Sequence, residues 1–145
     1  MSETYTQMMK RHHDEFNKFP LGAAFNDEQF DEMMRKWGLE PTDTDKILRL
    51  FGGAFIRKSD KQAFDDMNKR HRVEVDEAIK NDTTGAGFIK QMFYYELCNH
   101  EYSYTMDPED TLDALGYTVD DILADERLKN GYALAEAEAR KVGWD

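Results

Sequence analysis

The chain has one cysteine, Cys98, and only three prolines, and it contains no long apolar run. A single cysteine cannot form a disulfide within the chain, which is typical of cytoplasmic rather than secreted proteins. No apolar stretch approaches the length of a membrane span, and the first residues lack the apolar core of a signal peptide. We therefore expect a cytoplasmic protein without a membrane-spanning segment.

Basic residues are also scarce: the chain has 19 Lys and Arg but 30 Asp and Glu, which gives a formal net charge of −11. This balance disfavours direct binding to nucleic acid or to an anionic membrane, since both require a basic surface. It favours a basic partner instead. The length of 145 residues fits one domain, and neither a repeat nor a linker interrupts it. We expect a single helical domain over residues 1–145.

The apolar spacing is helical along most of the chain and predicts an all-α, compact bundle of six or seven helices. Helix-start signals occur at Asn26, Ser59, Asp107 and Thr118. One short helix is expected to run through Leu50, and a longer one over residues 86–103. The glycine pair before residue 54 predicts at most one short extended segment, near residues 54–57, with its apolar side chains buried.

A histidine–glutamate constellation is the first candidate site. Glu96 and His100 are four residues apart and so share one helix face, while His71 lies on the apolar stripe of the preceding long helix. All three side chains are expected in one helix–helix seam. They could form a metal or acid–base site, or a buried hydrogen-bonded network. The pair of histidines around a glutamate that marks many helical metal sites is missing. We favour the network, and assign no metal, cofactor or catalytic residue.

An acidic segment is the second candidate, because residues 96–126 contain no lysine or arginine. Such a surface could imitate nucleic-acid phosphates and occupy the basic groove of another protein. Alternatively, acids at helix starts complement the helix dipole, and the face is merely solvated. We expect the centre of a protein interface at six acidic residues from this segment: Glu109, Asp110, Asp113, Asp120, Asp121 and Asp125.

Three segments carry a family resemblance: "GGAFIRKSDKQAFDDMNKRH", "TGAGFIKQMFYYELCNHEY" and "TLDALGYT". They resemble an uncharacterised family of small acidic proteins from gut bacteria, phages and other mobile elements. The resemblance covers about Phe16 to Ala135. Ala54 interrupts the family's "GGFIRK" pattern, and Cys98 fills the variable position of "YEL-x-NHEY". The family has no established activity, so no catalytic residue is implied. What it implies is a setting of conflict between phage and host.

The expected function is therefore inhibition by binding. The predicted partner is a basic, nucleic-acid-binding host defence protein, such as a nuclease or CRISPR effector, contacted through the acidic face. Direct nucleic-acid or membrane binding is not expected. Two alternatives remain open at this point. One is an enzyme that uses His71, Glu96 and His100, with or without a metal, and the other is a regulatory or structural dimer. The sequence leaves the oligomeric state undecided.

Overall fold

The computed structural model describes residues 3–141, which divide into two compact units. We call residues 12–72 the central unit, and residues 1–11 together with 73–145 the terminal unit. The boundary falls within α1 (Tyr5–Lys18) and within α3 (Lys61–Asn81). The fold is mostly helical, but it includes a small sheet, so the expectation of an all-α fold is wrong in this respect. Whether the chain folds as one domain stays a prediction.

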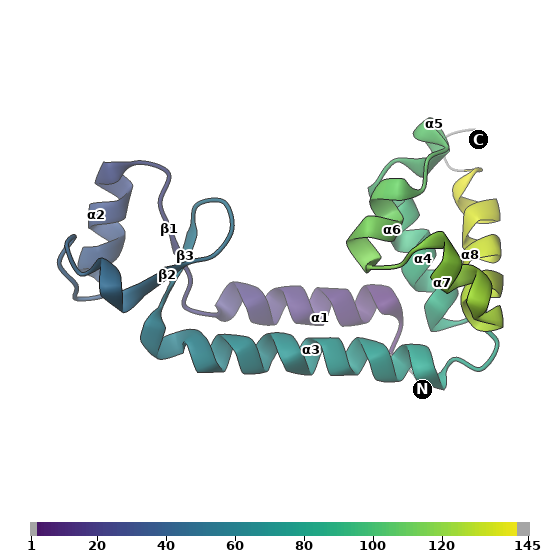
Figure 1. Ribbon diagram of the computed structural model, residues 1–145, viewed down its shortest axis with the longest axis horizontal. Coiled ribbons are helices and arrows are strands. Elements are labelled where there is room, and N and C mark those ends of the chain that lie inside the picture. Colours follow the sequence, from purple (N-terminus) through teal and green to yellow (C-terminus); the bar gives the residue numbers. More distant parts are fainter. Residues whose placement is uncertain (1–2, 142–145) are drawn as a thin grey trace. The chain divides into compact units, whose positions relative to one another are not determined.

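The central unit contains the sheet, shown beside α2 in Figure 1. After α1 come β1 (Gly22–Ala23) and α2 (Asp27–Lys36), then the 3-10 helix η1 (Thr44–Lys46). Next are β2 (Ile47–Arg49), β3 (Ala54–Arg57), the 3-10 helix η2 (Lys58–Asp60) and the first half of α3. The strand order is β1-β3-β2, and both pairings are antiparallel. Leu48 lies opposite Ile56 in the register.

The middle strand, β3, organises the packing of this unit. It confirms the extended segment expected near residues 54–57, and its Phe55 and Ile56 are buried as predicted. Phe55 packs with Met33 and Met34 of α2. Ile56 packs with the side chains that α3 contributes. Because consecutive strand residues point to opposite faces, burial of Phe55 and Ile56 against different helices ties the sheet to both α2 and α3.

Two expected helices differ from the structure. The prediction of a short helix through Leu50 is wrong: η1 ends at Lys46, and β2 follows because the chain there pairs with β3. The helix over residues 86–103 is interrupted, since α4 ends at Asn99. Glu101 then takes a left-handed conformation, with φ 57°, before the short α5. A left-handed residue cannot continue a right-handed helix, so the chain turns here.

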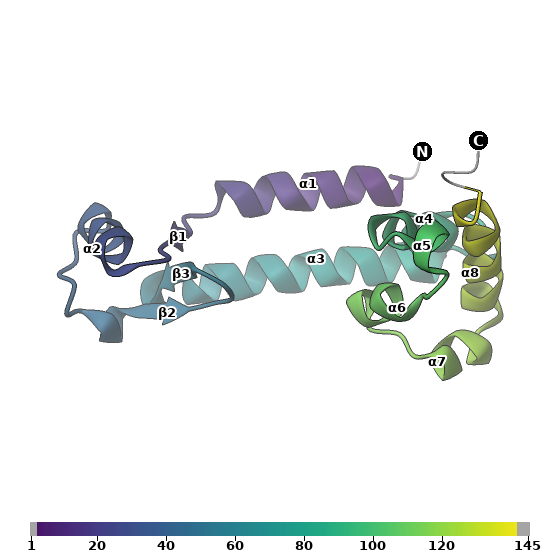
Figure 2. The same ribbon diagram turned by 90° about the horizontal axis from the view of Figure 1, so that it is seen from above.

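The terminal unit is built around α4 (Phe88–Asn99) and α8 (Glu126–Ala139), which lie side by side in both views (Figures 1 and 2). Between them in sequence come α5 (Tyr102–Thr105), α6 (Glu109–Leu115) and α7 (Val119–Ala124). Ile89, Phe93 and Leu97 of α4 are completely buried, as are Ala135 and Ala139 of α8. The small residues of α8 allow the bulky side chains of α4 to pack closely against it.

Among residues 3–141, no helix combines the length and the apolar character that crossing a lipid bilayer requires.

Candidate functional site

Helix α6 turns its carboxylates away from the core of the terminal unit. Its inner side carries Thr111 and Leu112, which are buried. Its outer side carries Glu109, Asp110 and Asp113, which are all exposed. Successive helical residues are rotated by about 100°, so Asp110 and Asp113 lie close together on the side away from the buried pair. The helix thus offers an acidic ridge to solvent.

Helix α7 follows after a tight turn. Gly116 ends α6 in the left-handed conformation, with φ 78°, and the Tyr117 amide donates to the carbonyl oxygen of Leu112 at 3.0 Å. Thr118 then caps α7. Asp120, in the first turn of α7, is exposed. The two acidic helices are therefore joined through only two residues between the last residue of α6 and the cap of α7.

Some nearby carboxylates are occupied with the backbone instead. Asp121 accepts from the Thr118 amide at 2.9 Å, and this bond lowers the pKa of the Asp121 carboxyl. Asp125 accepts from the amide of Arg127 at 2.9 Å and caps α8, and its hydrogen bond with the Arg127 guanidinium lowers the pKa of the Asp125 carboxyl. Of the six nominated acids, Asp125 is a helix cap and Asp121 completes the capping box of Thr118. The other four are exposed carboxylates outside the cap positions.

Glu96 is held by contacts from three elements. Its Oε1 accepts from the Tyr5 hydroxyl at 2.9 Å, and its Oε2 lies 3.6 Å from Nε2 of His100. Its main-chain oxygen accepts from the Thr111 hydroxyl at 3.1 Å. The Glu96 and His100 side chains are 15% and 29% exposed. Through its carboxylate and its main-chain oxygen, Glu96 links the start of α1, the end of α4 and α6, which is a structural task that needs no ligand.

His71 lies in the central unit, among different neighbours. Its ring stacks on that of His12, with centroids 3.9 Å apart and planes 12° from parallel. Its Nε2 is 3.5 Å from Oε2 of Glu15, which also pairs with Arg70. The predicted seam that would unite this histidine with Glu96 spans two units and stays a prediction. Within the part of the chain that the structure describes, no group of three or more His, Cys, Asp or Glu side chains could hold a metal ion.

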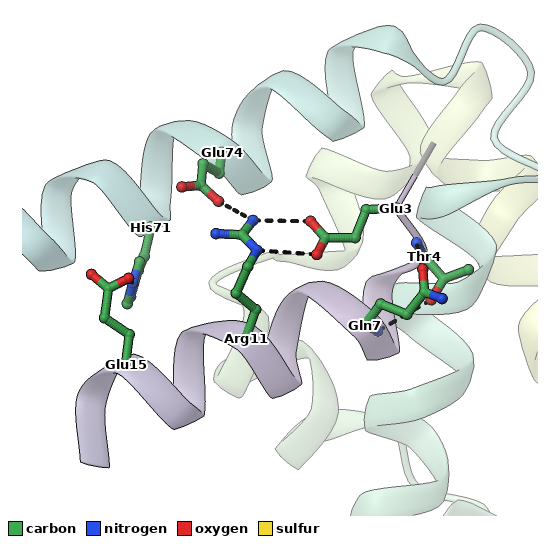
Figure 3. Close-up of polar contacts among 7 residues, drawn as sticks. All are labelled: Glu3, Thr4, Gln7, Arg11, Glu15, His71 and Glu74. Atoms are coloured by element: carbon green, nitrogen blue, oxygen red, sulfur yellow. Dashed lines mark hydrogen bonds and ion pairs between the residues drawn. The ribbon is translucent and has the colours of Figure 1, made fainter. Parts of the chain in front are cut away.

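A pocket of the terminal unit contains an arginine, Arg11, whose charge is already paired with two carboxylates. Arg11 lines it together with Glu3 and Glu74, and its guanidinium donates hydrogen bonds to both carboxylates (Figure 3). The two Glu3 bonds to Arg11 measure 3.1 and 2.9 Å. Because two acids neutralise this guanidinium, the pocket offers an anionic ligand no free positive charge.

Two residues important to this unit were not found by sequence reasoning. Tyr5 could have been noticed, because Tyr5 and Met8 have the spacing of a buried helical stripe. No sequence signal indicates that Arg127 donates to main-chain oxygens of residues 79, 80 and 82. Such long-range contacts depend on where α8 packs.

The comparisons with known proteins agree with the resemblance. The model of a family of unknown function, DUF7659, matches residues 4–138. The chain belongs to this family. The prediction of an uncharacterised family is thereby confirmed. No curated protein and no solved structure matches the chain. Membership of this family assigns no activity, so function must be argued from the surface of the molecule.

Buried tyrosines should make the protein less stable in alkali. Burial, and then the Glu96 carboxylate, raise the pKa of Tyr5, and burial raises the pKa of Tyr132 to about 12. In the unfolded chain both hydroxyls ionise near their ordinary value of 10.0. Their contribution to the free energy of unfolding is therefore complete below pH 10 and is lost as the pH rises toward 12. Urea unfolding across this range should show the loss.

Tyr5→Phe tests the same point. Without its hydroxyl, the variant should lose about 1–2 kcal/mol of unfolding free energy at neutral pH, because a charge-assisted hydrogen bond is removed. It should also lose less further stability between neutral pH and alkali than the wild type does. An alkaline loss of the same size in both proteins would contradict the role given to Tyr5.

Proposed function

We propose that this protein is a non-enzymatic binding module that inhibits a basic, nucleic-acid-binding protein through the acidic face of α6 and α7. The action is of the anti-CRISPR or anti-restriction type, with the face imitating the phosphates of a nucleic acid. The proposal places the protein in the cytoplasm of a host cell, encoded by a phage or mobile element. Its partner is a nuclease or CRISPR effector.

The observation that supports this proposal is the separation of exposed acids from helix caps. Glu109, Asp110, Asp113 and Asp120 are exposed, whereas the carboxylates of Asp121 and Asp125 accept from backbone amides at the starts of α7 and α8. Hydrogen bonding at helix starts therefore does not account for the four, although Glu109, Asp110 and Asp120 lie in first helical turns, where their charges also complement the helix dipole. Residues 96–126 supply no cation to balance them. Like charges grouped in this way cost the folded protein free energy, which is offset when a basic surface binds.

The physics of such binding resembles that of DNA binding. A groove that receives DNA is lined by lysine and arginine and gains free energy when condensed counterions leave the DNA. Carboxylates on a rigid helical ridge present fixed negative charges to the same cations. Since the attraction acts between exposed charges, it is screened over a distance of about 8–10 Å in physiological salt. Binding should therefore weaken steeply as salt is added.

An amide substitution tests the acidic face. D110N/D113N/D120N keeps the shape of three side chains and removes their charges. With the variant immobilised, capture of DNA-binding proteins from a host lysate should fall by about tenfold or more, since each exposed pair contributes up to about 1 kcal/mol. The proteins that the wild type captures should be released by salt and displaced by duplex DNA.

A matched control separates the face from net charge. E32Q/E40Q/D45N removes the same number of charges from exposed acids of the central unit. This control should capture the same proteins as the wild type. Equal capture by all three proteins would overturn the proposal, and so would equal loss in both variants, because total charge rather than the face would then decide binding.

A further inference from the structure

Helix α7 exposes two aliphatic side chains next to the acidic ridge. Val119 and Leu123 are each 59% exposed, whereas Ile122 of the same helix is only 5% exposed. Val119 and Leu123 are four residues apart and so share one face. Ile122 secures the other side of α7 in the core that it forms with residues of α4, α6 and α8. The outward position of the aliphatic pair is therefore set by the anchoring of the helix.

Single exposed apolar residues are normal on protein surfaces, so the charge around this pair is what makes it informative. Asp120 lies about 60° around the helix from Leu123, and the acidic ridge of α6 precedes the same turn. The face thus combines an apolar centre with carboxylates beside it. A nucleic acid or an anionic membrane would be repelled by these carboxylates.

The same charges argue against a second copy of this chain as the occupant. A symmetric dimer through α7 would bring the acidic ridges of two chains, each with a formal charge of −11, toward one another. Like charges facing each other suppress association. A basic protein surface has the complementary charge, and only an apolar site on that surface would bury Val119 and Leu123 favourably.

We infer that Val119 and Leu123 form the apolar centre of the interface, and that the partner is a protein whose basic surface carries aliphatic or aromatic side chains between its cations. This inference rests on the proposed function and adds the chemistry of the partner's surface to it. A purely polar groove, as a perfect nucleic-acid mimic would require, does not fit the exposed pair. The carboxylates beside the apolar centre set the association rate and its salt dependence, and the apolar centre sets the dissociation rate.

The test uses two synthetic lysine-rich helical peptides of equal length and charge. One carries leucines between its lysines, and the other carries serines at the same positions. The full-length wild type should bind the leucine peptide about tenfold more tightly than the serine peptide. In V119S/L123S this preference should disappear, while weak, salt-sensitive binding of both peptides remains.

Two further variants keep the test sharp. V73S/F51S removes two other exposed apolar side chains, 45% and 67% exposed, and should keep the preference for leucine. If circular dichroism shows that the double variant is poorly folded, L123Q replaces it in the test. Glutamine is a good helix former, and L123Q should lose most of the preference for leucine.

The outcomes separate this inference from the proposed function. If V119S/L123S keeps the preference, or the wild type has none, the apolar centre is overturned while charge-dependent binding still stands. If the wild type sediments as a dimer and V119S/L123S as a monomer, a second copy is the occupant and the inference is overturned. If D110N/D113N/D120N binds both peptides as the wild type does, the proposed function fails, and this inference fails with it.

Discussion

Replacing Gly85 with alanine should destabilise the terminal unit by about 2–5 kcal/mol, from backbone strain and overpacking together. Gly85 has φ 86°, in the left-handed region that side chains with a Cβ adopt at a cost. A Cβ at this position would lie 2.0 Å from the main-chain oxygen of Arg127. That oxygen belongs to the first turn of α8 and cannot move without moving the helix.

Gly116→Ala is the matched control for this prediction. Gly116 also has a positive φ, 78°, but a Cβ there would meet nothing within 4 Å. It should cost only the conformational strain, about 1–2 kcal/mol. Urea denaturation followed by circular dichroism measures both changes. Equal costs for the two variants would show that the close approach of Gly85 to α8 is not important for stability.

Arg127→Ala should cost about 2–3 kcal/mol of unfolding free energy, because it removes charge-assisted hydrogen bonds to two partly buried main-chain oxygens, those of Ile79 and Asp82. The Nη1 of Arg127 donates to the main-chain oxygens of Ile79, Lys80 and Asp82, at 2.9, 3.3 and 3.1 Å. The oxygens of Ile79 and Lys80 lie in the last turn of α3, where carbonyls lack a partner within the helix, and that of Asp82 follows directly. The Ile79 oxygen also accepts from the Asp82 amide at 3.2 Å. Arg127 therefore caps one helix from the start of another.

Arg127→Lys distinguishes charge from geometry. A lysine keeps the positive charge but lacks the planar fork of donors, so it should recover less than half of the lost stability. Lys61→Ala is the control, because Lys61 is 59% exposed and pairs with Asp65 on its own helix. That substitution should cost at most about 0.5 kcal/mol. A lysine variant as stable as the wild type would mean that charge alone is sufficient.

Local signals predicted the helix starts at Asn26 and Thr118 well, whereas the cap predicted at Ser59 is wrong, because Ser59 lies inside the 3-10 helix η2 and α3 begins at Lys61. Asn26 accepts from the Gln29 amide, and Thr118 forms a reciprocal capping box with Asp121, as their spacing indicates. The four-residue spacing of Glu96 and His100 likewise brings their side chains together. These features depend on atoms within one helical turn, so the sequence alone contains the information that places them.

Pairing between distant segments was predicted less well. Ile47–Arg49 falls within the short helix expected through Leu50, yet it becomes a strand because β3 offers partners six to ten residues later. Burial of Ile47 and Phe55 offsets the free-energy cost of that pairing. Local secondary-structure propensity does not include such burial. The contacts of His71 with His12 and Glu15 also join separate helices, and no spacing rule indicates them.

The sequence by itself determined the helical character of most of the chain, its acidic segment and its family. Periodicity, caps and charge are properties of neighbouring residues and need no fold to be recognised. The tertiary structure decided which acids are exposed and which cap helices, which partners hold Glu96, and that Val119 and Leu123 face outward. Each of these depends on how α4, α6, α7 and α8 pack, because packing alone determines which side of a short helix water can reach.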